Sequence, residues 1–272
     1  TYNKHNISNT FSWKLNQLRI VLLGAKGSGK TSALNTILCR ETSRPLGSTA
    51  RCSAAGGLVF GRRLTVVDTP GWWINYFCHE SSLFDRRETA LALGLCPPGP
   101  HVFLLVVRAD RAFGDAHRRA AREHLGLIGE QVWRRVLVLF TFGDWLGGGG
   151  AERHIESEGR PLRRLVRECG DRCHVLNNKS GGDELQVREL IGKIEAVLCG
   201  RDGGWHYEVE RRVMEQLQEE VRREEARAEE RLMRRDQQRA ERTRKLGALN
   251  TLMLSTSHSG INRPRPDQIR QP

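Results

Sequence analysis

The 272-residue chain has no apolar stretch that approaches the about 18–20 residues a helix needs to cross a bilayer. Its first residues, TYNKHNISNTF, lack both an initiator methionine and the apolar core of a signal peptide. We therefore predict a soluble protein without a membrane span, and we expect the chain to be a fragment or a processed piece.

The chain also lacks the cysteine pattern of a disulfide framework, because its seven cysteines are odd in number and scattered. Only Cys169 and Cys173 lie close together, and Gly170 and Asp171 between them indicate a helix end rather than half of a zinc site. Such cysteine usage is typical of a reducing compartment. We predict a cytoplasmic protein, with the periphery of a membrane as a second location.

Acidic residues are in the minority, since Lys and Arg outnumber Asp and Glu by 44 to 32 and the formal net charge is +12. The resulting positive field attracts anions such as nucleotide phosphates, nucleic acid or acidic lipid, and it does not choose among them. No aromatic-and-basic RNA-binding motif or recognition-helix pattern is visible, so no specific nucleic acid is expected as a partner.

Short apolar runs alternate with helical spacings, which predicts an α/β fold with a largely parallel sheet. The runs are apolar nearly throughout, as expected when helices cover both faces of a sheet. In such a sheet the ligand binds beyond the carboxyl ends of the strands. The predicted strands are 18–23, 63–68, 101–107, 135–140 and 173–177. The predicted helices are 30–38, about 81–95, 115–128, 152–168 and 185–198.

Composition divides the chain into four parts. Residues 1–15 are predicted to be a polar linker, 16–200 the globular domain, 205–246 a Glu- and Arg-rich helix, and 247–272 a disordered tail. Within the domain, the GGGG at 147–150 predicts a flexible loop.

The Glu- and Arg-rich helix carries only a thin apolar stripe. Two interpretations stay open, a solvated surface helix and a coiled coil with a partner helix. The members of the stripe are Val213, Leu217, Val221, Ala228 and Leu232.

The octapeptide GAKGSGKT at 24–31 matches G-x-x-x-x-G-K-[ST] and stands between an apolar strand and a helix. Its glycines let the backbone wrap a phosphate, Lys30 adds a charge near the β- and γ-phosphates, and Thr31 offers a hydroxyl to Mg²⁺. The helix N-terminus adds positive potential. The predicted nucleotide-contacting residues here are Gly24, Ala25, Lys26, Gly27, Ser28, Gly29, Lys30, Thr31 and Ser32.

The tetrapeptide DTPG at 68–71 follows this loop by about forty residues and ends a predicted strand. In P-loop proteins a carboxylate at this place holds Mg²⁺, usually through water. We therefore predict Asp68 as a magnesium residue and Gly71 as a donor to the γ-phosphate. Taken alone, DTPG is equally an ordinary turn with a helix-capping aspartate.

The run LFTFGDWL at 139–146 ends a predicted strand on a single carboxylate. A carboxylate there accepts from the N1–H and N2–H₂ donors of guanine, which adenine does not present, so Asp144 is predicted to read the base. Thr141 stands where an Asn-Lys-x-Asp box has its Asn, and Phe142 replaces the Lys. We predict that Phe142, with Trp145 beside it, stacks on the base. The alternative is that both are core or surface aromatics.

Polar residues follow the last predicted strand, in HVLNNKSGGD at 174–183. The amides of Asn177 and Asn178 can bond the guanine edge while Lys179 or Ser180 closes the turn. Read alone, this segment is only a loop.

Together these segments resemble the GIMAP family of immunity-associated GTPases, whose domain is of the AIG1 type. The likeness runs from about Leu18 to Leu198, and in weaker form into the charged helix. It rests on the motifs GAKGSGKT, STARC, DTPGWW, LCPPGPHVFLLVV, VLFTFGDWL and HVLNNK.

The resemblance implies a Ras-like G domain of the P-loop NTPase class, followed by a long C-terminal helix. It further implies that the protein binds GTP or GDP with Mg²⁺ and forms a homo-oligomer through its nucleotide face when GTP is bound. It also implies Thr49 as a switch residue, so that Thr31, Thr49 and Asp68 face the metal.

One departure from Ras-type GTPases bears on catalysis. Trp72 and Trp73 follow DTPG, where a Gln orients the attacking water, and no glutamine occurs from there to Gln131. Intrinsic hydrolysis is therefore expected to be slow. Arg108 and Arg111 are candidates for an arginine supplied in trans by a second protomer, and the alternative for both is ordinary surface charge.

Three functions are the resulting hypotheses. The favoured one is a GTP-dependent switch whose output is its own assembly. The second is a GTPase enzyme in which dimerisation assembles the catalytic residues. The third is a basic nucleic-acid binder driven by ATP, which the guanine box disfavours.

Overall fold

The computed structural model describes residues 16–40, 51–73, 88, 91–178, 183–199, 206–208 and 211–258. The chain divides into two compact units, Thr1–Glu219 and Glu220–Pro272. The first unit contains the sheet and the predicted nucleotide residues, and the second contains most of the last helix.

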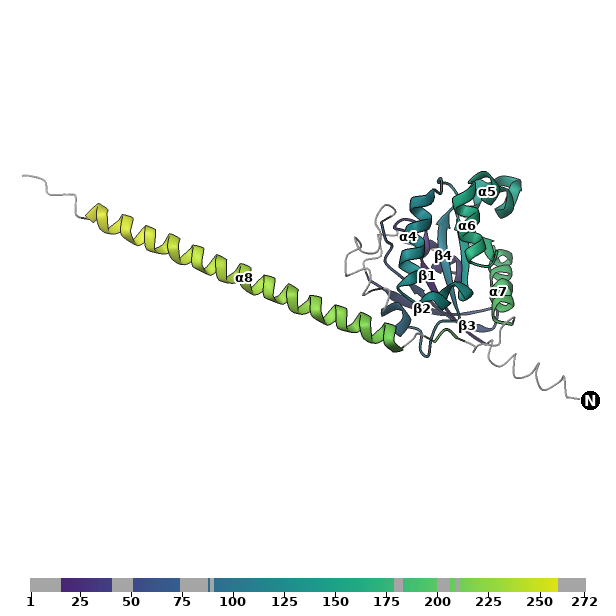
Figure 1. Ribbon diagram of the computed structural model, residues 1–272, viewed down its shortest axis with the longest axis horizontal. Coiled ribbons are helices and arrows are strands. Elements are labelled where there is room, and N and C mark those ends of the chain that lie inside the picture. Colours follow the sequence, from purple (N-terminus) through teal and green to yellow (C-terminus); the bar gives the residue numbers. More distant parts are fainter. Residues whose placement is uncertain are drawn as a thin grey trace, which may run out of the picture. The chain divides into compact units, whose positions relative to one another are not determined.

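A six-stranded sheet forms the centre of the first unit (Figure 1). Its strand order is β2-β3-β1-β4-β5-β6. Neighbouring strands run parallel except β2 and β3, which run antiparallel. The predicted α/β fold with a mostly parallel sheet is confirmed, and each of the predicted strands corresponds to an observed one. The strands are β1 (Gln17–Leu23), β2 (Ser53–Val59), β3 (Arg62–Asp68), β4 (Val102–Arg108), β5 (Val136–Thr141) and β6 (Cys173–Val175).

Helices cover both faces of this sheet, because its central strands are apolar on both sides. Along β1, Ile20 and Leu22 pack into one buried cluster with α2 and α7, and Val21 and Leu23 pack into the other with α4 and α6. The helical elements are α2 (Lys30–Ile37), α4 (Asp115–Gly126), α5 (Gly150–Ser157), α6 (Arg160–Glu168) and α7 (Glu184–Cys199), with the 3₁₀ segments η1 (Glu130–Arg135) and η2 (Gly143–Gly149).

Strand β2 has no counterpart among the predicted strands. Its sequence, SAAGGLV, contains no apolar run, and only Val59 is buried. The strand lies at the edge of the sheet and is held by antiparallel backbone pairing with β3, from Ser53 opposite Asp68 to Val59 opposite Arg62. Pairing with a neighbour, not side-chain pattern, makes this segment a strand.

The prediction of one helix over 152–168 is wrong, because α5 and α6 replace it. Gly159 separates them with a φ of 81°, which interrupts the helical backbone. The GGGG segment, predicted as a flexible loop, instead ends η2 and begins α5, whose Ile155 packs against the core. Of the predicted helix 81–95, only residues 88 and 91–95 are described.

Helix α8 (Arg211–His258) runs further than the predicted end at residue 246, so disorder from 247 onward is the wrong prediction for residues up to 258. The segment ALNTLML is rich in strong helix formers, and Gly247 costs only about 1 kcal/mol in a helix interior. Of the apolar stripe, Leu232 has a described side chain, and it is 56% exposed. The coiled coil stays a prediction.

Residues 1–15 and 259–272 lie outside the described residues. In the part of the chain that the structure describes, no helix is both long enough and apolar enough to cross a membrane.

The CPPGPH segment packs at the amino end of β4, the edge of the sheet away from the phosphate loop. The N–H of Arg19 donates to Nδ1 of His101 at 2.9 Å, and Nε of Arg19 donates to the carbonyl of Gly99 at 2.6 Å. The N–H of Tyr207 donates to the carbonyl of Pro100 at 2.7 Å. The segment therefore anchors β4 and the chain that precedes α8.

Acidification should destabilise the protein through two buried histidines. Burial and the charge of Arg19 lower the pKa of His101 to about 3, and burial with Lys193 lowers the pKa of His174 to about 4. In the unfolded chain both titrate at about 6.5, so below that pH the unfolded chain binds more protons and stability falls. Between about pH 7.5 and about pH 5.5 we expect a loss of about 1.4 kcal/mol per histidine in the free energy of unfolding, measured by urea denaturation.

In the variant His101→Asn, the loss of stability between these two pH values should be smaller by about 1.4 kcal/mol. Asparagine does not titrate, and its side-chain oxygen can accept from the N–H of Arg19 in place of Nδ1. The same slope of stability against pH in the variant and the wild type would contradict the assignment to His101.

Candidate functional site

The segment 24–29 joins β1 to α2 and forms the predicted phosphate loop. Gly24 has a φ of 152°, and a Cβ at this position would lie 2.6 Å from the carbonyl oxygen of Val106 in β4. Only glycine allows this approach. Gly29 is the N-cap of α2, so the loop leads into a helix N-terminus whose N–H groups are available to an anion.

Lys30 begins α2 and is 6% exposed. Its ammonium donates to the carbonyls of Gly24 and Ala25, each at 3.0 Å. Burial lowers the pKa of Lys30 to about 8, and the nearby carboxylate of Asp68 opposes that shift. The loop therefore encloses a cation that is mostly protonated at neutral pH.

Thr31 and Asp68, two of the three predicted magnesium residues, are in contact. The hydroxyl of Thr31 donates to Oδ2 of Asp68 at 2.5 Å, and Asp68, the last residue of β3, is 2% exposed. A hydroxyl and a carboxylate fit Mg²⁺, which takes few protein oxygens and completes its shell with water and phosphate. The third predicted residue, Thr49, lies outside the described residues, as do Lys179 and Ser180.

The DTPG segment lies directly on the phosphate loop. The N–H of Lys26 donates to the carbonyl of Trp72 at 2.7 Å, and Ala25 forms a parallel bridge with Trp72. A Cβ on Gly71 would lie 2.5 Å from backbone atoms of Lys26, so this approach also needs glycine. Gly71 thus lies against the loop, as a donor to a γ-phosphate must.

The indole of Trp72 is buried in the core. It is 6% exposed and stacks on His124 of α4, with ring centroids 4.5 Å apart and an interplanar angle of 18°. Trp73 is 57% exposed, and the ammonium of Lys26 lies 4.3 Å from its ring centroid. Neither residue offers the carboxamide that orients water in Ras-type GTPases.

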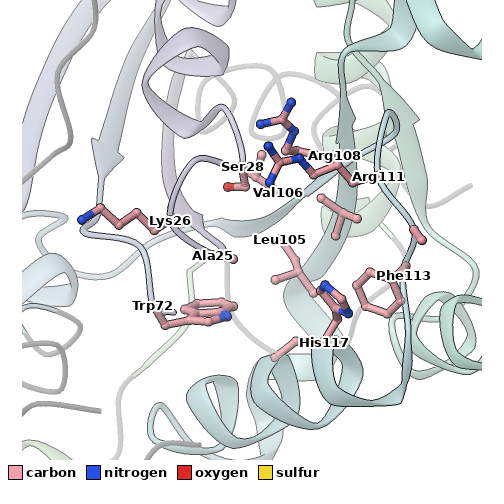
Figure 2. Close-up of a pocket in the computed structure, with 13 residues that line it drawn as sticks. Ala25, Lys26, Ser28, Trp72, Leu105, Val106, Arg108, Arg111, Phe113 and His117 are labelled. Atoms are coloured by element: carbon pink, nitrogen blue, oxygen red, sulfur yellow. The ribbon is translucent and has the colours of Figure 1, made fainter. Parts of the chain in front are cut away.

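A pocket opens beside the phosphate loop, between β4 and α4 (Figure 2). Trp72 lies on one side of the pocket, and Phe113 and His117 lie on the other. Arg108 and Arg111 also line it. The pocket therefore brings both candidate arginines next to the predicted nucleotide site.

The predicted base box contacts the phosphate loop through Thr141. This residue ends β5, is fully buried, and donates its hydroxyl to the carbonyl of Ser28 at 2.7 Å. A threonine thus supports the loop from the position that Asn has in the usual box. Phe142 follows with a φ of 58°, and Asp144 is exposed in η2, next to Trp145, which is 66% exposed.

Arg108, the last residue of β4, is bound within its own protomer. Its Nε and Nη2 donate to the two carboxylate oxygens of Asp110 at 2.7 and 2.5 Å, and its Nη1 donates to the carbonyl of Gly27 at 3.2 Å. The hydrogen bonds between Arg108 and Asp110 raise the pKa of Arg108 and lower the pKa of Asp110. The guanidinium carbon lies 4.1 Å from the ring centroid of Phe142. Asp110 was not among the predicted site residues, although its spacing from Arg108 was a usable signal.

The segment after β6 is fixed against α2 and α7. In the amide orientation that satisfies both neighbours, Asn178 accepts from the N–H of Ala33 at 3.1 Å and donates to the carbonyl of Leu176 at 3.2 Å. The side chain of Gln186 accepts from the N–H of Asn177 at 2.8 Å and donates to its carbonyl at 3.2 Å. Gln186, which is 8% exposed, was not among the predicted site residues, and the signal that pointed to it was a glutamine on an apolar helix face.

The sequence model of the AIG1 family matches residues 18–227. The chain belongs to the AIG1 family. GTPase IMAP family member 8 of Rattus norvegicus is 31% identical over 193 residues, which cover 68% of this chain and 27% of that protein. Immune-associated nucleotide-binding protein 8 of Arabidopsis thaliana is 30% identical over 190 residues, which cover 65% of this chain and 53% of that protein. This AIG1 chain thus spans about a quarter of the length of the rat relative and about half of the length of the Arabidopsis relative.

The AIG1 chain also has the fold of solved P-loop GTPases. Toc33 from Arabidopsis thaliana in complex with GDP and Mg²⁺ is similar with a TM-score of 0.58 and 17% identity, over 75% of this chain and 92% of that chain. The predicted family and the predicted P-loop NTPase fold are both confirmed. The family match extends past residue 200, the predicted end of the globular domain, into α8.

Proposed function

We propose that this AIG1 chain binds GTP and GDP with Mg²⁺ and is a switch that self-associates through its nucleotide face when GTP is bound. The observation that carries the proposal is a convergence at the carboxyl edge of the sheet. Lys30 follows β1, the Thr31–Asp68 pair joins α2 to β3, and Thr141 of β5 contacts the phosphate loop. The residues that bind the phosphates, hold the metal and support the phosphate loop therefore lie at one edge of the sheet.

In the phosphate half of the site, each residue is proposed to bind either a phosphate or the metal. The N–H groups of the loop and the ammonium of Lys30 bind the β- and γ-phosphates. Mg²⁺ neutralises phosphate charge when bound, and Thr31 and Asp68 hold it, joined by Thr49 in the GTP state. Gly71 donates its N–H to the γ-phosphate.

The base half uses the segments after β5 and β6. Asp144 accepts from the two guanine donors, and Phe142 stacks on the ring. The amide of Asn178 is bonded to α2 and to Leu176, so we assign it to holding the loop. Asn177 is then the proposed contact to the guanine edge.

Slow hydrolysis in a single protomer is part of the proposal. It is supported by the burial of Trp72 against His124, in the place of a water-orienting Gln. An arginine from a second protomer would accelerate the reaction by stabilising charge in the transition state. Arg111 suits this role better than Arg108, because Arg108 is bound to Asp110 in its own protomer.

Self-association is supported by what is described for Toc33. One Toc33 structure is of a dimerisation-deficient arginine-to-alanine mutant, and another is described as showing that dimerisation is important for the GTPase activity of atToc33 and psToc159. For the AIG1 chain the corresponding alternative is a GTPase enzyme whose hydrolysis, stimulated by dimerisation, is itself the output.

The variant Asp144→Ala should lose the preference for guanine. Two hydrogen bonds to a charged acceptor disappear, so we expect affinity for GTP to fall by about 100-fold while affinity for ATP is unchanged. Titration with fluorescent GTP and ATP analogues plus Mg²⁺ measures both affinities, and light scattering follows the mass of each state.

The matched control is Glu156→Ala, which removes another exposed carboxylate, on α5. It should bind as the wild type does. Wild-type protein that does not distinguish GTP from ATP would overturn the guanine assignment, and a monomer in the GTP state would overturn the switch by assembly.

A further inference from the structure

We propose that Arg108, held by Asp110, is the positioning residue of the base site and supplies the charge of the lysine that the base box lacks. The inference rests on the proposed function, since it concerns the same nucleotide site. In the usual box one lysine lines a face of the base with its stem and carries a cation. Here the ring of Phe142 replaces the stem, and the guanidinium of Arg108 replaces the cation.

The sheet register places these two side chains together. Arg108 ends β4 opposite Thr141, the last residue of β5, and Phe142 is the next residue along. The guanidinium carbon lies 4.1 Å from the ring centroid, a distance typical of an arginine over an aromatic face. Arg108 therefore covers one face of the ring. Phe142 is half-buried, and we place the guanine base on the face of its ring that Arg108 does not cover.

The guanidinium is fixed in plane as well as in place. Asp110 takes two of its nitrogens in a forked pair, and the third donates to the carbonyl of Gly27 in the phosphate loop. This geometry needs the planar fork of arginine, which a lysine ammonium cannot reproduce. One side chain thus links the base platform to the loop that binds the phosphates.

The backbone of Phe142 explains why such support is needed. Its φ of 58° lies in the left-handed region, which an aromatic residue rarely adopts. Backbone bonds hold the turn on either side, from Gly143 N–H to the carbonyl of Leu176 at 3.0 Å and from Trp145 N–H to the carbonyl of Phe142 at 3.0 Å. Arg108 adds the contact that fixes the ring itself, so the platform is formed before the base arrives.

The variants Arg108→Gln and Arg108→Lys test the platform. Affinity for Mg²⁺–GDP should fall by about 10-fold in Arg108→Gln, and Arg108→Lys should recover only part of it because it keeps the charge without the fork. Affinity for Mg²⁺–pyrophosphate, which has no base, should fall much less. Isothermal titration calorimetry measures both ligands, and the melting temperature of each variant reports on folding.

The chain contains a matched control away from the site. Arg188 of α7 lies over the ring of Phe60 at 3.8 Å and pairs with Glu184 at 3.2 Å, and Phe60 has a φ of 49°. Arg188→Gln removes an arginine from the same combination of aromatic ring, carboxylate and positive φ. It should leave affinity for Mg²⁺–GDP unchanged.

The outcomes separate this inference from the proposed function. Wild-type protein that fails to bind Mg²⁺–GDP would overturn the proposed function itself. Wild-type binding with equal affinity in Arg108→Gln would overturn the platform alone. Equal losses for Mg²⁺–GDP and Mg²⁺–pyrophosphate would also overturn it, because Arg108 would then support only the phosphate loop. A selective loss for Mg²⁺–GDP supports it.

Discussion

Replacing Lys30 with methionine should strongly weaken nucleotide binding and leave the free protein folded. The ammonium lies inside the phosphate loop at 3.0 Å from the carbonyls of Gly24 and Ala25. A phosphate bound in the loop would lie close to this positive charge and be attracted by it. Removing one partner of a buried charge pair costs about 2–5 kcal/mol, which is roughly a 30-fold to 5,000-fold loss of affinity. Titration with a fluorescent GDP analogue measures it.

The free protein should tolerate Lys30→Met because the buried ammonium is itself costly. Its pKa of about 8 shows that burial disfavours the charged form. Methionine is of similar length and has no charge to desolvate, so we expect the free energy of unfolding to change by less than about 1 kcal/mol. Lys193→Met on α7, which removes an exposed cation, is the control and should bind normally. Normal affinity in Lys30→Met would contradict the role given to Lys30, and unfolding of the variant would contradict the expectation that the free protein tolerates the change.

Replacing Trp72 with alanine should cost about 3–5 kcal/mol in the free energy of unfolding, the usual range for a buried tryptophan. The indole is 6% exposed, belongs to the buried cluster beneath α4, and stacks on His124. Alanine would leave a cavity between the phosphate loop and α4 that the rigid strand β4 cannot close. Urea denaturation monitored by circular dichroism measures the loss.

The neighbouring Trp73 is the matched control for this experiment. It is 57% exposed, and its contact with the ammonium of Lys26 is worth about 0.5–1 kcal/mol. Trp73→Ala should therefore cost no more than about 1 kcal/mol. Equal costs for the two variants would mean that the DTPGWW segment packs differently from the structure. A more mobile DTPG segment in Trp72→Ala should also weaken GTP binding more than GDP binding, since Gly71 is the proposed donor to the γ-phosphate.

Local pattern determined much of this fold. The runs LRIVLL and RVLVLF are apolar throughout because both sheet faces are covered, and that property can be read without any neighbour. The phosphate loop is also local, since one glycine-rich turn between a strand and a helix shapes it. The positions of Asp68 and Asp144 followed from the same reasoning, because the ends of parallel strands share one edge.

Pairing and contacts between distant segments were decided by tertiary structure. The SAAGGLV segment becomes β2 only through hydrogen bonds to β3, which side-chain pattern does not encode. Thr141 supports Ser28 across a separation of 113 residues, so a base box without Asn looks incomplete until the two strands are placed. From the sequence Arg108 was either a candidate for an arginine supplied in trans or an ordinary surface charge, until the register of β4 and β5 set it over Phe142.

By itself, then, the sequence of this AIG1 chain determined the α/β architecture, the phosphate loop and the carboxylates at the strand ends, because each depends on residues close together in the chain. The burial of Trp72, the support of the loop by Thr141 and the platform of Arg108 and Phe142 were decided only in three dimensions. Their physical reason is common to all three: a side chain's role depends on which distant partner the sheet register brings within bonding distance.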